Sequence, residues 1–403
     1  MNAAVLTLIA AVFGIPAFAL VTLTLAAIVN QLRRARMLPQ SVRLPLPPQR
    51  LAVIIPAHNE SHHLVPTVKN LLEQLKQRDQ QDRLIVVADN CSDDTVKHAS
   101  DAGAIVIERT AVLERGKGYA LAFAFDYLSG DPPDVVVVVD ADCLVSDGAL
   151  SALAIACQET GRPAQIPSLM QARESAGLTI RTMEFAMLMK NFVRPLGSSQ
   201  LGDVCHLMGT GMALPWSLIG TAQVATPNIV EDLMLGTDLA SLGYPAVFLP
   251  AYVVTSTFMN NPSIVRQQKE RWEHGYLQVM LVKLPAMIAT AVRRRDWSLA
   301  VLALDLSIPP IALYFLMLCA MLFFSGLLAC FSACAYDALW TLIGIACCFV
   351  SAILLGWWFF GRHILTLSDL LKSPVYAFWK LPIYLAFLFK KYARWNRTER
   401  DDH

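Results

Sequence analysis

Residues 1–31 contain no charged side chain, and this is the most restrictive feature of the sequence. The stretch from Ala3 to Asn30 would extend roughly 42 Å as an α-helix, more than the ~30 Å hydrocarbon core of a bilayer. Three arginines follow within residues 33–36, whereas no basic segment precedes the apolar run, which favours an uncleaved anchor over a signal peptide. We therefore predict a transmembrane helix over residues 1–31 with its N-terminus outside, since basic flanks stay in the cytoplasm.

Two more long uncharged runs occupy residues 306–335 and 338–361, and tryptophans near the second run suit a membrane interface. We predict that both runs cross the membrane and return the chain to the cytoplasm at Arg362. An apolar share of 55%, with only 16% charged residues, agrees with membrane spans joined to a globular part. A helix break is expected at Ser307–Pro310, and Asp305 before it could line a cytoplasmic mouth or an acceptor path.

Two shorter apolar stretches are interpreted as interfacial helices. Residues 276–296 contain Lys283 and a proline, and they end close to consecutive arginines. Residues 371–395 contain Lys380 and a proline, and spanning would export the basic tail in which they end. Both stretches are therefore expected to lie on the cytoplasmic leaflet.

Residues 47–275 show a different pattern, in which short β-branched runs alternate with longer amphipathic ones. This alternation is typical of an α/β domain, and the continuously apolar strands indicate a sheet buried on both faces. The expected strands are Leu51–Ile55, Leu84–Ala88, Ala104–Ile107, Val135–Val139 and Ala246–Leu249. The expected helices are Ser61–Gln77, Lys117–Tyr127, Leu178–Phe192 and Val230–Leu242.

Polar residues gather where three of these strands end, and ligands of such sheets bind at the carboxyl ends of the strands. Residues 56–60 follow the first strand, and Asp89, which could bind a nucleobase or ribose, follows the second. Asp140 and Asp142 follow the fourth, with both side chains expected on one side of the pleat. Two such carboxylates predict a Mg²⁺ or Mn²⁺ ion that bridges diphosphate oxygens, with a plain surface turn as the alternative.

Other short motifs have both a chemical and a structural interpretation. Arg115–Gly118 places cations before a helix, where Lys117 could clamp a diphosphate or simply be solvated. Gly209–Thr210–Gly211 permits a close approach to an acceptor sugar or a tight turn. Glu231 and Asp232 open a helix, where they could cap it or supply a catalytic base.

The segment Gln268–Trp272 pairs a guanidinium with an indole at adjacent positions. Arg271 could grip a diphosphate while Trp272 offers a flat face to a sugar ring. The structural alternative is a membrane-proximal amphipathic helix with an interfacial tryptophan.

In their order and spacing these motifs resemble the membrane glycosyltransferases of family 2, the group of cellulose, chitin and hyaluronan synthases and the Nod-factor chitooligosaccharide synthase. The resemblance runs from about Leu51 to Trp272 and includes the membrane layout. The matching residues are Asp89 for the aspartate after the second strand, Asp140 and Asp142 for D-x-D, Val230-Glu231-Asp232 for T-E-D, and Gln268, Arg271 and Trp272 for Q-x-x-R-W. Val230 replaces the threonine, and the membrane region is smaller than in synthases that thread long polymers through a pore.

The resemblance implies a Rossmann-like glycosyltransferase A fold and a metal-dependent transferase that inverts the anomeric centre. Asp232 would be the catalytic base, with Glu231 beside it. The implied donor-binding residues are Pro56, Glu60, Asp89, Lys117, Asp140, Gln268, Arg271 and Trp272. The implied acceptor residues are Gly209, Thr210, Gly211 and Trp272, and the implied Mg²⁺ or Mn²⁺ ligands are Asp140 and Asp142.

The implied substrates are a nucleotide-diphosphate sugar, with UDP as the expected nucleotide, and a glycan or lipid-linked acceptor in exopolysaccharide or cell-surface glycan synthesis. Single addition to a membrane lipid is the alternative reaction. The implied location is a bacterial-type inner membrane with a cytoplasmic catalytic domain, where other polysaccharide-assembly proteins are conceivable partners. A net charge of +1 gives no global field that would favour nucleic acid.

Two other classes of protein fit the sequence less well. A membrane-tethered oxidoreductase should carry G-x-G-x-x-G after the first strand, where this chain has residues 56–60. A transporter or scaffold would leave the polar strand ends without a purpose, and few charges lie within the apolar runs. The nine cysteines have neither zinc-site spacing nor the density of a disulfide scaffold.

Overall fold

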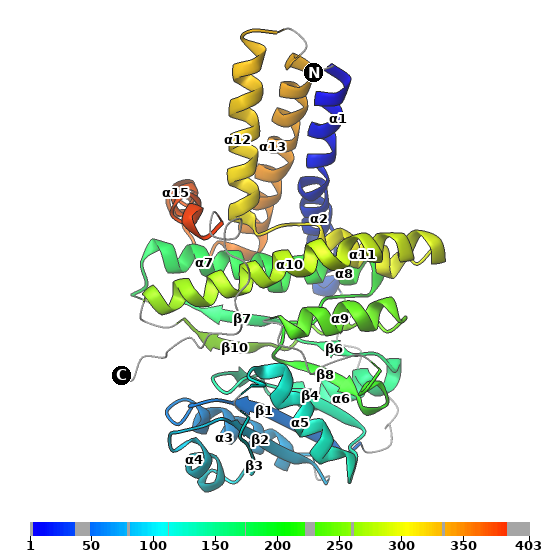
Figure 1. Ribbon diagram of the computed structural model, residues 1–403, viewed down its shortest axis with the longest axis vertical. Coiled ribbons are helices and arrows are strands. Elements are labelled where there is room, and N and C mark those ends of the chain that lie inside the picture. The colour runs from blue at the N-terminus through cyan, green and yellow to red at the C-terminus, as the bar shows by residue number, and fades with distance from the viewer. Residues whose placement is uncertain are drawn as a thin grey trace. The chain divides into compact units, whose positions relative to one another are not determined.

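The computed structural model describes residues 3–36, 49–78, 81–111, 113–173, 175–221, 230–258, 262–332 and 335–384. The chain folds into two compact units, each assembled from separate segments of sequence (Figure 1). The helical unit comprises Met1–Leu38, Ala172–Gly202 and Met280–Lys391, and the sheet unit comprises Pro39–Gln171, Asp203–Val279 and Tyr392–His403. The last part of the expected C-terminal interfacial helix, residues 385–395, lies outside the described residues, as does the end of the basic tail.

The described part of the sheet unit contains a sheet of seven strands in the order β3-β2-β1-β4-β8-β6-β9. These strands are β1 (Leu51–Ala57), β2 (Arg83–Asp89), β3 (Ile105–Arg109), β4 (Val135–Val138), β6 (Ala164–Gln165), β8 (Met212–Pro215) and β9 (Val247–Phe248). Neighbours among β1, β2, β3 and β4 are parallel, whereas β8 runs antiparallel to β4 and β6. A small second sheet has the order β5-β10-β7, from β5 (Leu144–Val145), β7 (Ser168–Gln171) and β10 (Val254–Thr257).

The five strands predicted from the sequence are all present, with boundaries that differ by no more than two residues. Their apolar runs form strands because both faces of the sheet are covered: every residue of β4 is buried, and so is most of β1 and β2. The helices of this unit are α3 (Leu64–Lys76), α4 (Thr95–Asp101), α5 (Lys117–Ser129), α6 (Ala149–Thr160) and α9 (Glu231–Ser241), with a 3₁₀ turn at Trp216–Leu218.

The register of the sheet brings several loops to one edge. In the parallel pairs Val138 lies opposite Ile54, so β1, β2 and β4 all end at this edge, which we call the carboxyl edge. In the antiparallel pair Val138 lies opposite Met212, the first residue of β8. The residues that precede β8 therefore reach the same edge as those that follow β4.

The helical unit contains the long apolar helices. Its helices are α1 (Ala3–Phe13), α2 (Ile15–Arg36), α7 (Leu178–Leu188), α8 (Arg194–Gly202), α11 (Trp297–Leu306), α12 (Ile311–Ala329), α13 (Tyr336–Gly356), α14 (Leu367–Lys372) and α15 (Pro374–Trp379), with π-helical turns at Met189–Val193 and Trp357–Gly361. α10 (Pro262–Arg294) begins in the sheet unit and continues into the helical unit at Met280. The expected break at Ser307–Pro310 is present between α11 and α12.

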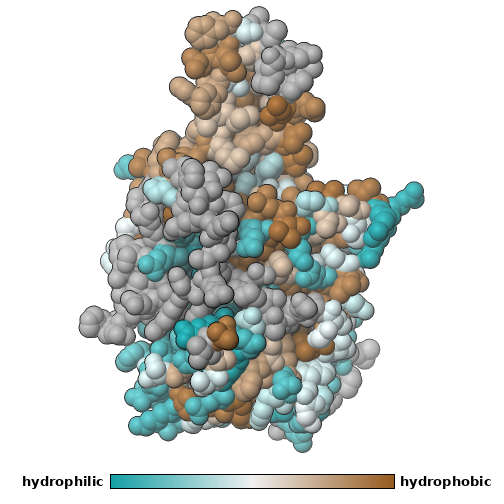
Figure 2. Space-filling view, in the orientation of Figure 1, coloured by the Kyte–Doolittle hydropathy of each residue, from teal (hydrophilic) through white to brown (hydrophobic). Residues whose placement is uncertain are grey.

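Four described segments are long and apolar enough to cross a membrane: Thr7–Arg34, Gln267–Arg294, Ile311–Ala329 and Tyr336–Gly361. Three coincide with the predicted spans, and the other contains most of residues 276–296, for which the interfacial position stays a prediction. Within the helical unit, α11 runs crosswise to α12 and α13 (Figure 1). On the face in Figure 2, the described surface of α12 and α13 is largely apolar, as expected for side chains that face lipid.

Residues 172–202, which the sequence analysis included in the α/β region, pack instead in the helical unit. Gly197 allows α8 to touch the backbone of Leu23 in α2, where a Cβ would collide. Arg194 of α8 forms a buried ion pair with Asp305 of α11, at 2.7 Å from Nε to Oδ1, and also donates to the Asp305 carbonyl. Asp305 thus takes part in the packing of this unit, and its position at a cytoplasmic mouth or an acceptor path stays a prediction.

Candidate active site

All of the site residues predicted from the sequence lie in the sheet unit, and most of them reach the carboxyl edge. Asp89 is the last residue of β2, Pro56 lies one residue before the end of β1, and Asp140 follows β4. Gly209–Gly211 directly precedes β8, and the Gly211 amide donates to the carbonyl of Val138 at 2.9 Å. The antiparallel pairing of β8 with β4 is what joins this glycine turn to Asp140.

The sequence predicts that Asp140 and Asp142 continue the pleat of the fourth strand, but in the structure the strand ends before them. β4 ends at Val138, and the next residues form a turn in which the Cys143 amide donates to the Asp140 carbonyl at 3.2 Å. The pleat therefore cannot place the two carboxylates on one side. Their common location at the carboxyl edge comes from this turn, which Thr67 of α3 also holds through its hydroxyl bond to the Ala141 carbonyl.

Lys117, the first residue of α5, connects the two loops. Its Nζ lies 2.5 Å from Oδ1 of Asp140 and 2.6 Å from the carbonyl oxygen of Gly209. The Asp140 amide in turn donates to the hydroxyl of Thr210 at 3.0 Å. One ammonium thus ties the D-x-D turn to the glycine turn, and this is the most closely connected part of the site.

Asp232, in the first turn of α9, approaches the same glycine turn. A Cβ placed on Gly209 would lie 2.9 Å from Oδ2 of Asp232 and 3.3 Å from Nζ of Lys117. Gly209 also has a φ of +82°, a conformation that side chains disfavour. Glycine is needed at this position for two reasons, and its lack of a side chain lets the Asp232 carboxylate come close to Lys117.

The electric field in the site is set by this cation and three carboxylates. Burial alone would lower the pKa of Lys117, but Asp140, Glu231 and Asp232 outweigh it and raise that pKa, so the ammonium stays charged. Burial raises the pKa of Glu231 to about 8; Lys117 opposes this shift, and Asp232 and Asp140 add to it. Glu231 therefore holds its proton to a higher pH than an exposed glutamate does.

The Q-x-x-R-W residues lie on one face of α10. Gln268, Arg271 and Trp272 are spaced i, i+3 and i+4, and Gly275 extends the same stripe by one turn. A Cβ on Gly275 would lie 3.0 Å from both methyl carbons of Val230, the residue before Glu231. This face of α10 is therefore directed at the start of α9.

Asp89 is held by a residue that the sequence analysis did not select. Strand register pairs Asp89 with Arg109, whose Nη1 donates to Oδ1 of Asp89 at 2.8 Å. Arg109 also binds the side chain of Glu114 at 3.0 Å and lies 5.6 Å from the ring centroid of Tyr119. The sequence signal that could have identified Arg109 is its position, two residues after the predicted strand Ala104–Ile107. Glu60, three residues after the end of β1, is mostly buried, and its amide donates to the Thr95 hydroxyl.

Gln165 of β6 was also missed. Its side chain is fully buried, its Nε2 donates to the carbonyls of Thr210 and Gly211 at 2.8 and 3.1 Å, and its Oε1 accepts from the Met208 amide. A buried amide with these bonds fixes the backbone of the glycine turn. No sequence pattern marks this residue, because its function depends on the pairing of two very short strands.

The carboxylates at the D-x-D turn fit a divalent cation in one particular manner. Among the described residues, no three His, Cys, Asp or Glu side chains come together as a metal site. Asp140 and Asp142 would thus supply one or two protein oxygens, and the other ligands would come from a substrate. Mg²⁺ is commonly held in this way, by one or two carboxylates and the phosphates of a nucleotide.

The comparison with known families agrees with this geometry. The family described as "Glycosyltransferase like family 2" matches residues 47–275, more than half of the chain. The chain therefore belongs to glycosyltransferase family 2, and its fold is the predicted glycosyltransferase A type with apolar helices attached.

Individual relatives are more distant. The chain is 26% identical over 257 residues to the "Probable glycosyltransferase YdaM" of Bacillus subtilis (strain 168). The aligned region covers 61% of this chain and 59% of that relative's length. Among solved structures, the mannosyltransferase PcManGT of Pyrobaculum calidifontis, in complex with GDP-Man and Mn²⁺, is 19% identical with a TM-score of 0.43, and the alignment covers 86% of this chain and 99% of that one. Glucosyl-3-phosphoglycerate synthase of M. tuberculosis is 22% identical with a TM-score of 0.35, covering 56% and 80%.

Proposed function

We propose that this protein transfers a sugar from a nucleotide-diphosphate sugar to a glycan or lipid-linked acceptor, with inversion at the anomeric carbon. The observation that carries this proposal is the arrangement around Gly209, where the Asp232 carboxylate, the Lys117 ammonium and Asp140 come together. A base beside a cation at the edge of a sheet is what displacement of a diphosphate requires.

In the proposed reaction, Asp232 accepts the proton of the acceptor hydroxyl as the acceptor oxygen bonds to the anomeric carbon. The bond from that carbon to the diphosphate breaks, and its electron pair leaves with the diphosphate. Lys117 lies where it would stabilise the negative charge that develops there. Glu231, whose pKa is raised, would be protonated more readily than an exposed glutamate and could then donate a hydrogen bond.

Asp140 and Asp142 are the proposed ligands of Mg²⁺ or Mn²⁺. When bound, the ion supplies positive charge to the diphosphate leaving group. Pro56, Glu60 and Asp89 belong to the proposed nucleotide side of the site, with Arg109 as the residue that orients Asp89.

The remaining residues of the motifs are assigned by their place on α10 and at the glycine turn. Gln268, Arg271 and Trp272 share the α10 stripe directed at α9, which supports contacts of Arg271 with the diphosphate and of Trp272 with a sugar ring. Gly209, Thr210 and Gly211 would lie beside the acceptor.

The subtype proposed from the motifs is a membrane synthase similar to cellulose, chitin or hyaluronan synthases, with a UDP-sugar donor.

The proposed location is a bacterial-type inner membrane, with the sheet unit in the cytoplasm and the N-terminus outside. Exposed arginines at the end of α2 support this orientation. A reporter fused after His403 should be active on the cytoplasmic side, and strong activity on the other side would reverse the assignment.

Purified protein incubated with a panel of UDP- and GDP-sugars and Mn²⁺ tests the proposed reaction. We expect nucleotide release that depends on one donor, is abolished by EDTA and is restored by Mg²⁺ or Mn²⁺. Asp142→Ala should lose this activity, and a matched change at the exposed Asp101→Ala, on α4, should keep it. Full activity of Asp142→Ala would remove the metal from this pair, and product length would separate polymer synthesis from single addition.

A further inference from the structure

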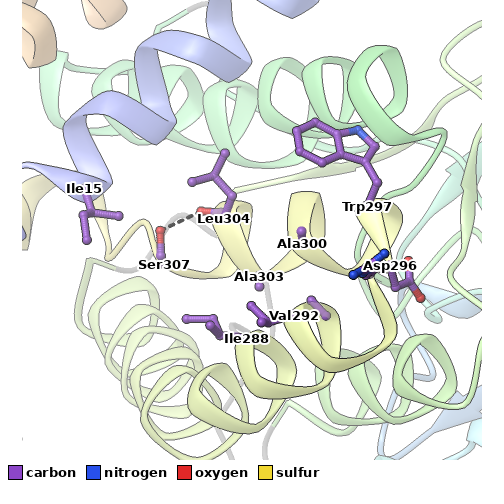
Figure 3. A pocket seen from close by; sticks show the side chains of 11 residues that line it. Ile15, Ile288, Val292, Asp296, Trp297, Ala300, Ala303, Leu304 and Ser307 are labelled. Carbon is purple, nitrogen blue, oxygen red and sulfur yellow. Dashed lines mark hydrogen bonds between the residues drawn. The ribbon is translucent and has the colours of Figure 1, made fainter.

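The helical unit contains an apolar pocket of about 400 Å³ outside the candidate active site, where α10 and α11 lie side by side (Figure 3). Ile288, Ala291 and Val292 line it from α10, and Ala300, Ala303 and Leu304 line it from α11. The i, i+3, i+4 spacing is the same on both helices, so two facing stripes form the walls. Three of these six side chains are alanines, which leaves space between the helices.

Three polar side chains around the pocket have partners within the protein. The Ser307 hydroxyl donates to the Leu304 carbonyl at 2.7 Å (Figure 3), and Oδ1 of Asp296 accepts from the Leu299 amide as the N-cap of α11. Nε1 of Trp297 donates to the Leu201 carbonyl at 2.8 Å. The pocket thus offers hydrocarbon surface, and its size is in the range of about 300–1,000 Å³ that is usual for ligand sites.

A strongly basic segment lies at one end of this pocket. Arg293, Arg294 and Arg295 are consecutive and all exposed, and Arg295 also belongs to the pocket lining. Asp296, the acid closest in sequence, is engaged as the helix cap. Next to it, Trp297 is 66% exposed, which suits the boundary between apolar and polar surroundings.

The apolar side chains continue onto the surface of the same helices. Val292 is 74% exposed and Ile288 is 48% exposed, although both also line the pocket. In the same unit α12 is an apolar helix of 19 residues with few buried side chains, so this unit exposes a surface suited to lipid. α11 runs crosswise to α12, as a helix at a membrane surface does (Figure 1).

We propose that this pocket binds an acyl chain of an anionic phospholipid, whose phosphate is held by Arg293–Arg295. Charge complementarity selects the headgroup, because the three consecutive guanidiniums outnumber the neighbouring Asp296 carboxylate and attract an anion. The apolar walls select the chain, because the facing stripes of α10 and α11 present only aliphatic side chains. The site would bind this lipid whether or not the protein transfers sugars.

The test measures the thermal unfolding of the full-length protein in a mild neutral detergent with added lipid. Phosphatidylglycerol should raise the unfolding midpoint in a saturable manner, and phosphatidylcholine with the same acyl chains should not. In the triple variant R293Q/R294Q/R295Q, half-saturation should need about tenfold more phosphatidylglycerol or higher. The matched control K69Q/K76Q/K97Q removes the same charge from exposed lysines of α3 and α4, and it should respond as the wild type does.

A second variant tests the hydrocarbon part. Ala300→Leu narrows the pocket and should weaken binding while leaving the preference for phosphatidylglycerol over phosphatidylcholine. Glycerol 3-phosphate, which has the phosphate without acyl chains, should give no shift. An unchanged response of the arginine variant, an equal response to both lipids, or a full shift with glycerol 3-phosphate would each overturn the proposal. Loss of transferase activity would not bear on it, because the measurement is lipid binding.

Discussion

Gly275 of α10 packs directly against Val230, so that a Cβ on the glycine would lie 3.0 Å from both Val230 methyl carbons. Val230 immediately precedes Glu231 and Asp232 at the start of α9. The position of the proposed base is therefore coupled to a helix that carries the Q-x-x-R-W residues, through one contact that tolerates no added methyl group without a shift.

This contact predicts that a glycine-to-alanine change at Gly275 lowers activity, whereas the same change in a helix without such a contact does not. Gly275→Ala should lower kcat several-fold, because α9 or α10 must move by a few tenths of an ångström and catalytic geometry is sensitive to such shifts. Gly326→Ala in α12 is the control, since its Cβ would meet no described atom within 4 Å. The control should gain stability of about 0.5–1 kcal/mol with unchanged activity. Equal kinetics of the two variants would show that the contact does not position Asp232.

Gly209→Ala tests the closest approach in the site. The new Cβ would displace the Asp232 carboxylate or the Lys117 ammonium, so we expect a loss of transfer of at least about 10²-fold. Gly161→Ala is the matched control, because Gly161 also has a positive φ, +63°, while its Cβ would meet no described atom. If both variants lose activity to the same extent, backbone strain and not the site contact would be responsible.

Asp232→Asn tests the base itself. Asparagine keeps the shape of the side chain but cannot accept the proton, so transfer should fall about 10²–10⁴-fold. Nucleotide binding, measured by calorimetry with UDP or GDP and Mn²⁺, should remain. Near-normal turnover would transfer the assignment to Glu231, and a simultaneous loss of nucleotide binding would contradict a role limited to proton transfer.

The raised pKa of Glu231 predicts a pH dependence of stability. The carboxyl titrates near its ordinary 4.5 when unfolded and near 8 when folded, so the stability due to its protonation is complete below about pH 4.5. That stability is lost as the pH rises through about 8. The unfolding midpoint of the wild type should therefore fall more steeply between about pH 5 and 8 than that of Glu231→Gln. Glu73→Gln, at an exposed position on α3, should retain the wild-type slope. An equal pH dependence of the unfolding midpoint in the wild type and both variants would refute the raised pKa of Glu231.

The ion pair between Arg194 and Asp305 predicts a stability effect without a catalytic one. Asp305→Asn leaves the buried guanidinium without its counter-charge and should cost about 3–5 kcal/mol. Asp131→Asn removes an exposed carboxylate that pairs with Arg50 and Arg83, and it should change the stability little, because solvent screens such pairs. Unfolding in detergent measures both. A stable Asp305→Asn variant with impaired transfer would instead support the interpretation of Asp305 as part of an acceptor path.

The sequence predicted the parts of the fold that local patterns specify. Five strands were recognised because their apolar runs are continuous, as in Val135–Val138. The sequence did not predict β5, β6, β7, β8 and β10, since two to four residues give no periodicity and their pairing depends on tertiary context. α10 was divided in the prediction near Gly275, yet the structure carries it through Gly275 and Pro285 as one helix.

The chemistry of the site was visible only as separate motifs. Asp140, Lys117, Gly209 and Asp232 are far apart in sequence, and the antiparallel strand β8 that brings the glycine turn to Asp140 was not predicted. Gln165 and Arg109 act on other site residues and carry no motif of their own. Patterns along the chain identify candidate groups, whereas the contacts between them depend on pairings that are not local.

The placement of residues 172–202 in the helical unit limits how this protein can be divided. The family match is continuous from 47 to 275, but the chain leaves the sheet unit after β7 and returns before β8. A fragment cut at both ends of the match would carry α7 and α8 without α2 and α11, leaving Arg194 without Asp305. A soluble version of the catalytic part would therefore need a new connection from Gln171 to Asp203 in place of the intervening helices.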